Sequence, residues 1–395
     1  MTTAMANEEE LLARIKEDEL VRLCQDMVRI KTVNPPGNER ENADYIAAYL
    51  RKIGIEVEIL SHTDTRATVV ARLKGSGKKP GLLYSGHLDV VPVGAQEWLH
   101  DPFGGEVIEG KLWGRGASDM KGGNAAIMVA AKVLAEANVP LKGDLILNFN
   151  AGEEGEQLGA NAAAAHLAGE RVQAVVIAEP SSNDVYIAEK GAFWLELTTY
   201  GKTAHGSTPH LGQNAIMMMV SLLSELDRLV VPYQEHPLLG GFTRSINTIT
   251  GGVKTNVVPD QCTVTVDQRT VPGQDHRAIL RQVEDLISDL SGKIPGFKAS
   301  VKVINDRIPV ASDPGETVVQ RFFDVVGKVS GKRPEPKGVA YYTDAVSLVP
   351  VLKAPLIICG PGEARLAHQP NEYVEVARLV ESAKILTLAA ARLLT

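Results

Sequence analysis

The chain opens with a helical pattern and then alternates between strand and helix patterns. Apolar residues from 8 to 30 recur every three or four positions, which predicts one amphipathic helix. A second helix is expected over 40–53, ending at Gly54. Beyond it we expect strands over 56–60, 67–73, 81–85, 145–149 and 174–177, and alanine-rich helices over 122–139 and 161–169. This alternation predicts an α/β fold with a mixed, largely parallel sheet and flanking helices.

The pattern changes near Lys190. Four expected strands (193–200, 245–250, 262–269 and 298–304) and two expected helices (214–230 and 274–290) follow in the order β-α-β-β-α-β. That order is typical of a ferredoxin-like α+β module. The α/β pattern returns at Asp306 and ends in a helix over 374–394. We therefore expect a discontinuous larger domain, residues 1–189 and 306–395, interrupted by a smaller domain of residues 190–305.

Composition excludes several classes of protein. With 44% hydrophobic and 23% charged residues, the chain is typical of a globular protein. Its formal net charge of −7 offers no global attraction to nucleic acid or to anionic lipid. The three cysteines form no C-x-x-C pair, which favours a reducing compartment over a disulfide scaffold. No signal peptide or membrane-spanning stretch is recognisable, so we expect a cytoplasmic protein.

Histidine and aspartate appear where the first apolar strands end. His87 and Asp89 follow the run 81–86, and alternate residues of an extended chain point to the same side. A metal-bound imidazole is often oriented by such a carboxylate. Asp119 lies in a glycine-bounded loop before an alanine-rich helix, where a carboxylate could bridge two cations. Taken singly, each residue could instead form an ordinary hydrogen bond at a strand end or cap a helix.

Further acids and a second histidine follow later strands. Glu153 and Glu154 come after 145–149, and adjacent carboxylates in a cleft raise each other's pKa unless cations neutralise them. One could bind metal while the other acts as general base; the alternative is a solvated acidic loop. Glu179 follows 174–177, and His368 lies in a loop after the run 355–359. Alone, these two would be a strand-end acid and a surface histidine.

Considered together, these residues point to metal chemistry. Imidazole and carboxylate without thiolate suit zinc, cobalt or manganese at a hydrolytic site. Competing motifs fail on inspection: the segment ending Gly201-Lys202-Thr203 has Glu196 where a phosphate-binding loop needs its first glycine. A dinucleotide fingerprint and a serine nucleophile elbow are also absent from the sequence. The sequence therefore favours a metal-dependent hydrolase.

These motifs, with 201–216, 250–272 and 360–373, resemble the metallopeptidase family of acetylornithine deacetylase, succinyl-diaminopimelate desuccinylase, carboxypeptidase G and the aminoacylases. The resemblance implies that the larger domain is catalytic and binds two divalent metal ions, most often Zn²⁺, with Co²⁺ or Mn²⁺ as alternatives. It implies that the smaller domain is a lid that mediates homodimerisation. The implied metal ligands are His87 and Glu179 for one ion, Glu154 and His368 for the other, and Asp119 as the bridge. It also implies a cis peptide after Asp119 and a role for Asp89 in orienting His87.

The same resemblance assigns the remaining roles. Glu153 would be the general base that activates a metal-bridging water. His205 of the lid would reach across the dimer to stabilise the oxyanion. Asn256 would lie near the substrate, and Arg269 would pair with a substrate carboxylate, which a planar guanidinium binds well. Tyr341 and Tyr342 stand where many members carry small residues, so we expect them to narrow or reshape the pocket.

The implied reaction is hydrolysis of the amide bond of an N-acyl amino acid, as in a deacetylase or desuccinylase, or of a small dipeptide. One alternative is a C–N hydrolase that acts on a non-amino-acid amide, amine or carbamoyl compound. Another is a metal-dependent binding protein without catalysis. The sequence leaves open the acyl group, the amino acid and the physiological metal.

Overall fold

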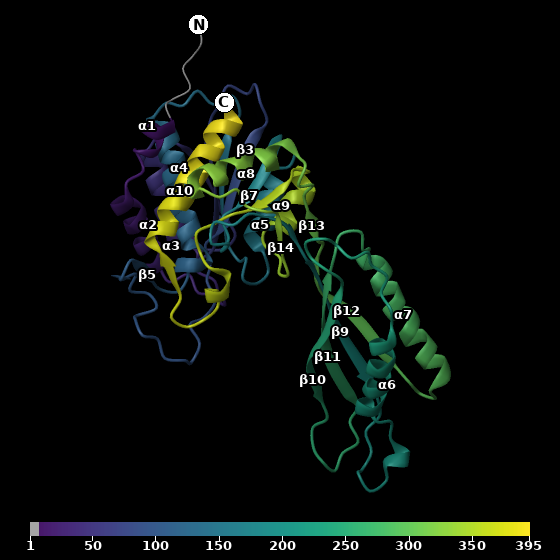
Figure 1. The fold of residues 1–395 in the computed structure, drawn as a ribbon. Coiled ribbons are helices and arrows are strands. Elements are labelled where there is room, and N and C mark those ends of the chain that lie inside the picture. Colours follow the sequence, from purple (N-terminus) through teal and green to yellow (C-terminus); the bar gives the residue numbers. More distant parts are fainter. Residues whose placement is uncertain (1–7) are drawn as a thin grey trace. The chain divides into compact units, whose positions relative to one another are not determined.

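The computed structural model describes residues 8–395, which form two compact units (Figure 1). The α/β unit comprises the described residues up to Ala188, together with Ala311–Gly338 and Thr343–Thr395. The ferredoxin-like unit comprises Glu189–Val310 and the short segment Val339–Tyr342. This second passage is tied to the first by a hydrogen bond from the Lys190 N–H to the Val339 carbonyl (3.2 Å). Residues 1–7, which belong to the expected larger domain, lie outside the described residues.

The sheet of the α/β unit has a parallel centre and antiparallel edges. Its strands lie in the order β1-β2-β6-β3-β7-β15-β8-β13, and β14 pairs with β8. Strands β6, β3, β7 and β15 run parallel, whereas β1 and β2 on one side and β8 on the other are antiparallel to their neighbours. The bounds are β1 Glu56–Ser61, β2 Ala67–Leu73, β3 Gly81–His87, β6 Leu145–Asn150, β7 Val172–Ile177, β8 Tyr186–Glu189, β13 Val310–Ala311, β14 Lys337–Val339 and β15 Leu356–Ile358. The expected mixed, largely parallel sheet is confirmed.

Helices flank this sheet, and the two most deeply buried, α4 and α10, pack side by side (Figure 1). The alanine-rich sequence of α4 permits close approach because its side chains are small. The helices are α1 Glu8–Leu12, α2 Glu17–Arg29, α3 Arg40–Lys52, α4 Gly122–Glu136, α5 Leu158–His166, α8 Thr317–Ser330, α9 Ala345–Leu352 and α10 Val376–Leu394. A small sheet, β16-β5-β4, and two single turns complete the unit: β4 Val107–Ile108, β5 Lys111–Trp113, β16 Tyr373–Glu375, η1 Ala117–Lys121 and η3 Ala364–Leu366.

One expectation about the helices is wrong. The pattern over 8–30 predicted a single helix, but the chain turns between α1 and α2, and Lys16 adopts an extended conformation (φ −103°, ψ 116°). The apolar periodicity continues through the turn, which is why the sequence pattern does not reveal it. Three acidic residues, 17–19, then form the first turn of α2, where they favour the positive end of a new helix dipole.

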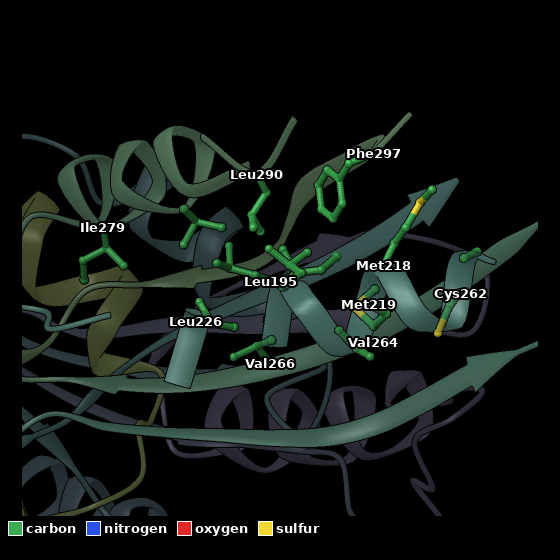
Figure 2. Packing of buried hydrophobic residues seen from close by; sticks show 14 of the residues in the cluster. Leu195, Met218, Met219, Leu226, Cys262, Val264, Val266, Ile279, Leu290 and Phe297 are labelled. Carbon is green, nitrogen blue, oxygen red and sulfur yellow. The ribbon is translucent and has the colours of Figure 1, made fainter. Parts of the chain in front are cut away.

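The ferredoxin-like unit is a four-stranded antiparallel sheet with two helices. The strand order is β10-β11-β9-β12, and α6 and α7 pack on a core that includes Leu195, Leu226 and Val264 (Figure 2). Its elements are β9 Gly191–Tyr200, η2 Pro209–Leu211, α6 Ala215–Arg228, β10 Thr243–Gly251, β11 Gln261–Thr270, α7 His276–Lys293 and β12 Ala299–Arg307. The β-α-β-β-α-β order is confirmed. Among the residues described in both units, no helix is long and apolar enough to cross a membrane.

An ion-pair cluster joins α1 to α10, and it makes stability dependent on pH. The Glu8 carboxylate accepts hydrogen bonds from Arg392 Nε (2.7 Å) and Nη2 (2.9 Å) and also pairs with Lys328. Arg392 lowers the pKa of Glu8 to about 2, below its ordinary value of 4.5. Because the folded-state pKa is depressed, this stabilisation is present above pH 4.5 and is lost as the pH falls towards 2.

We expect Glu8→Gln to lower the melting temperature by about 2–4 °C at pH 7, as for a loss of about 1 kcal/mol. The difference from the parent should shrink between pH 4.5 and 2. Thermal unfolding followed by circular dichroism across this range measures it. Glu41→Gln, an exposed acid in the first turn of α3, is the control. A difference that stays constant down to pH 2.5 would contradict the expectation.

Candidate metal centre and active site

The chemistry-bearing residues gather at the carboxyl ends of the parallel strands. His87 is the last residue of β3, and it lies in register with Asn150, the last residue of β6. The turn after β6 carries Glu153 and Glu154, and Glu179 follows β7. Because β3, β6 and β7 are parallel neighbours, their carboxyl ends meet at one edge of the sheet, where α/β folds bind ligands.

Asp119 lies between the two histidines. Its Oδ1 is 3.0 Å from His87 Nε2, and its Oδ2 is 3.6 Å from His368 Nε2. Each imidazole also has its own glutamate: His87 Nε2 is 3.6 Å from Glu179 Oε1, and His368 Nε2 is 2.9 Å from Glu154 Oε2. The structure thus brings together all five expected metal ligands. The expected cis peptide is present between Asp119 and Met120.

This donor set fits divalent cations. Ligand atoms of His87, Asp119 and Glu154 lie within 4.8 Å of one another, and so do those of His87, Glu153 and Glu179. Burial and the neighbouring carboxylates raise the pKa of Glu153, Glu154 and Glu179, which means that their negative charges are poorly accommodated without positive partners. Two imidazoles and several carboxylates without thiolate match the preference of zinc and related ions.

His87 lies among these acids, and its charged form is favoured there. Burial opposes a positive charge on His87, but Glu179 and Asp119 outweigh it and raise the pKa of the imidazole. In turn, His87 and His368 hold the pKa of Asp119 below its ordinary value despite burial. The site therefore has a negative potential that attracts cations.

Asp89 is buried and holds the turn that carries the two glutamates. Its Oδ1 accepts hydrogen bonds from the N–H groups of Gly152 (3.0 Å) and Glu153 (3.1 Å), and its Oδ2 accepts one from that of Glu154 (3.1 Å). His87 Nδ1 is 2.9 Å from the backbone carbonyl of Asp89 and 3.7 Å from its carboxylate Oδ1. The main chain of Asp89 thus provides the nearer acceptor for His87, and its role in orienting that histidine stays a prediction.

Two buried acids next to the site were not assigned roles from the sequence. Asp344 precedes α9, accepts a hydrogen bond from Asn150 Nδ2 (2.8 Å) and contributes to the raised pKa of Glu153. Glu372 lies four residues after His368 and contacts the loop that carries Asp119. The sequence offered two weak signals: Asp344 directly precedes an apolar helix, and Glu372 follows His368 by four residues.

In the ferredoxin-like unit, two of the three expected residues lie together. His205 is exposed, and its Nδ1 is 2.6 Å from Ser207 Oγ. The neighbouring Gly206 N–H donates to the carbonyl of Asn256 (2.8 Å), and His205 pairs with Val257 in an isolated bridge. His205 and Asn256 therefore belong to one pair of adjoining loops.

Arg269 lies near the end of β11, whereas Asn256 precedes the start of that strand. Aromatic side chains lie beside Arg269. Its Nε is 2.9 Å from Asp267 Oδ1, and its guanidinium lies 5.9 Å from the ring centre of Trp194 and 5.8 Å from that of Tyr342. Its Nε and Nη2 both donate to Asp267 Oδ2 (3.2 and 3.1 Å), so the guanidinium has an acidic partner as well as two aromatic neighbours. Tyr342, one of the two unusual tyrosines, thus contacts the expected carboxylate-binding residue.

Comparison with known proteins connects this geometry to a family. Residues 83–392 match Peptidase family M20/M25/M40. The chain is 31% identical over 388 residues to a probable succinyl-diaminopimelate desuccinylase of Staphylococcus epidermidis, covering 91% of this chain and 94% of that protein. It is 30% identical over 403 residues to an N-formyl-4-amino-5-aminomethyl-2-methylpyrimidine deformylase of Bacillus subtilis, covering 94% and 93%.

Solved structures share the fold. A metallo-carboxypeptidase of the M20 family from Sulfolobus solfataricus superposes with a TM-score of 0.81 at 20% identity, covering 95% of this chain and 99% of that chain. A Bacillus subtilis protein described as a dinuclear metal binding peptidase from the M20 family gives a TM-score of 0.72 at 18% identity, covering 96% and 98%.

Proposed function

The chain belongs to Peptidase family M20/M25/M40 and is an amide-bond hydrolase, and from that premise we propose its site chemistry. The proposed reaction is hydrolysis of an N-acyl amino acid or a small dipeptide at a centre of two divalent cations. The observation that carries it is the position of Asp119, whose two oxygens face two imidazoles that each have their own glutamate.

The proposed ligands follow from those distances. His87 and Glu179 would hold one cation, Glu154 and His368 the other, and Asp119 both. When bound, the ions polarise the scissile carbonyl and lower the pKa of water. We propose Zn²⁺, because mixed imidazole and carboxylate ligands suit it, with Co²⁺ or Mn²⁺ as substitutes.

Glu153 is the proposed general base. Its carboxylate lies beside the ligand set, with an oxygen within 4.8 Å of ligand atoms of His87 and Glu179, so it can reach a water bound there. It would accept a proton from the attacking water and pass it to the leaving amine. Asp89 would support this role, because it holds the Glu153 N–H and those on either side of it.

The proposed active unit is a homodimer formed through the ferredoxin-like unit. Strand β10 lies at an edge of its sheet and exposes apolar side chains, with Ile246 41% and Ile249 58% exposed. An open strand edge with apolar residues favours association with another chain. His205 is exposed on the same unit, and with Nδ1 bonded to Ser207 its Nε2 could donate to the oxyanion in the partner's site.

Complementation in mixed dimers tests this sharing. Glu153→Ala and His205→Ala homodimers should each be nearly inactive, because each lacks one group at every site. A mixed dimer has one site with both groups intact, so mixing after subunit exchange should restore up to about a quarter of parental activity per total chain. Exchange is monitored with two affinity tags. No recovery despite demonstrated exchange would refute the shared site.

Arg269 is the proposed anchor for a substrate carboxylate. A guanidinium can bind carboxylate in a bidentate way, and that of Arg269 lies 5.9 Å from the ring centre of Trp194 and 5.8 Å from that of Tyr342. Arg269→Lys should raise KM about tenfold or more for acylated amino acids, with a smaller change in kcat, because the lysine loses bidentate pairing. Arg228→Lys, an exposed arginine at the end of α6, is the matched control.

A substrate panel tests the function itself. The zinc-loaded protein is assayed for amine release from N-acetyl, N-succinyl and N-formyl amino acids and from dipeptides. Turnover of one of these classes, with loss of rate on the matching amide that lacks the carboxylate, is the expected result. All three cysteines are free rather than joined in disulfides, which supports the proposed cytoplasmic location.

A second candidate is hydrolysis of a non-amino-acid amide. It is supported by the similarity to the deformylase, whose named substrate is an N-formyl aminopyrimidine. N-formyl and N-acetyl heteroaromatic amines in the same panel decide between the two. Turnover confined to these compounds would replace the first proposal. Absence of turnover across the whole panel, with zinc bound, would favour the metal-dependent binding protein.

A further inference from the structure

Glu372 is a fully buried carboxylate whose two oxygens both serve one loop. Oε1 accepts hydrogen bonds from the N–H groups of Ser118 and Asp119, each at 2.9 Å. Oε2 accepts one from the N–H of Gly116 (3.0 Å) and one from Arg115 Nη1 (2.6 Å). Four donors on one carboxylate, three of them backbone groups from residues 116–119, are more than capping a single turn requires.

The loop held in this way is the one that delivers Asp119. Gly116 precedes η1 and residues 117–119 lie in its first part, where Asp119 has non-helical dihedral angles (φ −123°, ψ 93°), so no regular helix maintains its backbone. Gly116 has φ +87°, and a Cβ there would lie 2.6 Å from Val90 Cγ1. The loop is therefore confined by packing at Gly116 and hydrogen-bonded by the Glu372 carboxylate.

Glu372 is itself held in place by neighbouring backbone and side-chain contacts. It immediately precedes β16, which pairs with β5, and its carbonyl accepts a hydrogen bond from the Gly114 N–H (2.9 Å). Arg115 is 1% exposed, contacts the ring of Trp98 at 5.1 Å and also donates to the Gln369 carbonyl (3.2 Å). Arg115 thus places a buried positive charge next to the carboxylate and partly offsets the burial that raises the pKa of Glu372 to about 7.

We propose that Glu372 is a positioning residue for the metal centre. By bonding the backbone of residues 116–119, its carboxylate sets the two oxygens of Asp119 between His87 and His368. Because His368 is four residues earlier on the same segment, one stretch of chain provides a ligand and also fixes the bridging ligand. This inference rests on the proposed metal centre.

Zinc binding tests the role directly. Glu372→Gln keeps the size of the side chain but replaces one acceptor oxygen by an NH₂ group, which faces N–H donors. Zinc affinity is measured by competition with a chromogenic chelator, and Co²⁺ replaces zinc for visible absorption spectra. We expect a loss of zinc affinity of about 10- to 100-fold, as for other groups that orient metal ligands, with an altered cobalt spectrum. Glu372→Asp, which keeps the charge, should be intermediate.

The matched control is Asp144→Asn in the same unit. Asp144 also accepts from an arginine and a backbone amide, Arg72 Nη1 and the Gly75 N–H, each at 2.8 Å, but it precedes the amino end of β6, away from the centre. It should lose thermal stability and retain parental zinc affinity and cobalt spectrum. This separates positioning of Asp119 from a general effect of removing a carboxylate that holds an arginine and a backbone N–H.

The outcomes are distinct. Weakened zinc binding and an altered cobalt spectrum in a folded Glu372 variant, with Asp144→Asn unchanged, support the inference. If Glu372→Gln does not fold, Glu372→Asp is judged by the same measurements. Zinc affinity within twofold of the parent and an unchanged spectrum in a folded variant, or loss of the fold in both, overturns it. Failure of the parent protein to bind zinc would instead defeat the metal centre itself, and the inference with it.

Discussion

Glu153→Gln is expected to lose about 10²- to 10⁴-fold in kcat with its metal content unchanged. The substitution keeps the shape of the side chain but removes its ability to accept a proton from water. The metal should remain because the five proposed ligands are left intact. The hydrogen bond from the Glu153 N–H to the Asp89 carboxylate is also kept, because it does not involve the Glu153 side chain. Steady-state rates and metal analysis of the same preparation measure both quantities.

Glu156→Gln is the matched control for this experiment. Glu156 follows in the same turn but pairs with Arg66, and half of its side chain is exposed. Its substitution removes the same charge without removing a proton acceptor from the site, so kcat should stay within a few-fold of the parent. A Glu153→Gln protein with near-parental turnover would refute Glu153 as the base.

Removing the divalent cations should abolish hydrolysis reversibly. After treatment with a chelator, the metal-free protein should recover activity when zinc is added. It should bind two equivalents of zinc per chain at saturation, since Asp119 faces two separate imidazole–glutamate pairs. Asp119→Asn should fail to recover, because it replaces one of the bridging oxygens by an NH₂ group that cannot bind a cation. Metal content after dialysis and rates during zinc titration provide the measurements.

Asp313→Asn serves as the control for that variant. Asp313 is a turn aspartate of the same unit that accepts a hydrogen bond from the Gly315 N–H (2.8 Å), and its substitution should change neither zinc content nor turnover. Less than one equivalent bound per chain, even after reconstitution with zinc or cobalt, would count against the dinuclear centre. Full activity in the metal-free protein would also count against the dinuclear centre.

The elements near the site were predictable because their signals are local. The apolar-rich runs 81–85, 145–149 and 174–177 identified β3, β6 and β7, and polar residues that follow within a few positions became the candidate ligands. Parallel pairing then implied a shared edge. The turn between α1 and α2 was missed for a related reason: the apolar periodicity runs through it, and only the backbone direction changes.

Roles that depend on distant backbone groups were not predictable in the same way. In the sequence, Glu372 is marked only by its position four residues after His368, and Asp344 only by the apolar helix that follows it. Yet each bonds a group more than 190 positions away: Glu372 accepts from the Asp119 N–H, and Asp344 accepts from Asn150. The return of Val339–Tyr342 to the ferredoxin-like unit was not predictable for the same reason, because Val339 bonds Lys190, a residue far from it in the sequence.

By itself, then, the sequence determined the kind of chemistry: two histidines and several carboxylates at strand ends specify a site for cations, since side-chain type and strand periodicity are local properties. Only the tertiary structure decided how the site is held. It showed that the carboxylate of Asp89 bonds the glutamate turn, and that Glu372 bonds the loop of Asp119. The physical reason is that a buried carboxylate takes its partners from whichever backbone N–H groups the fold brings near, and the linear pattern of residues does not record those.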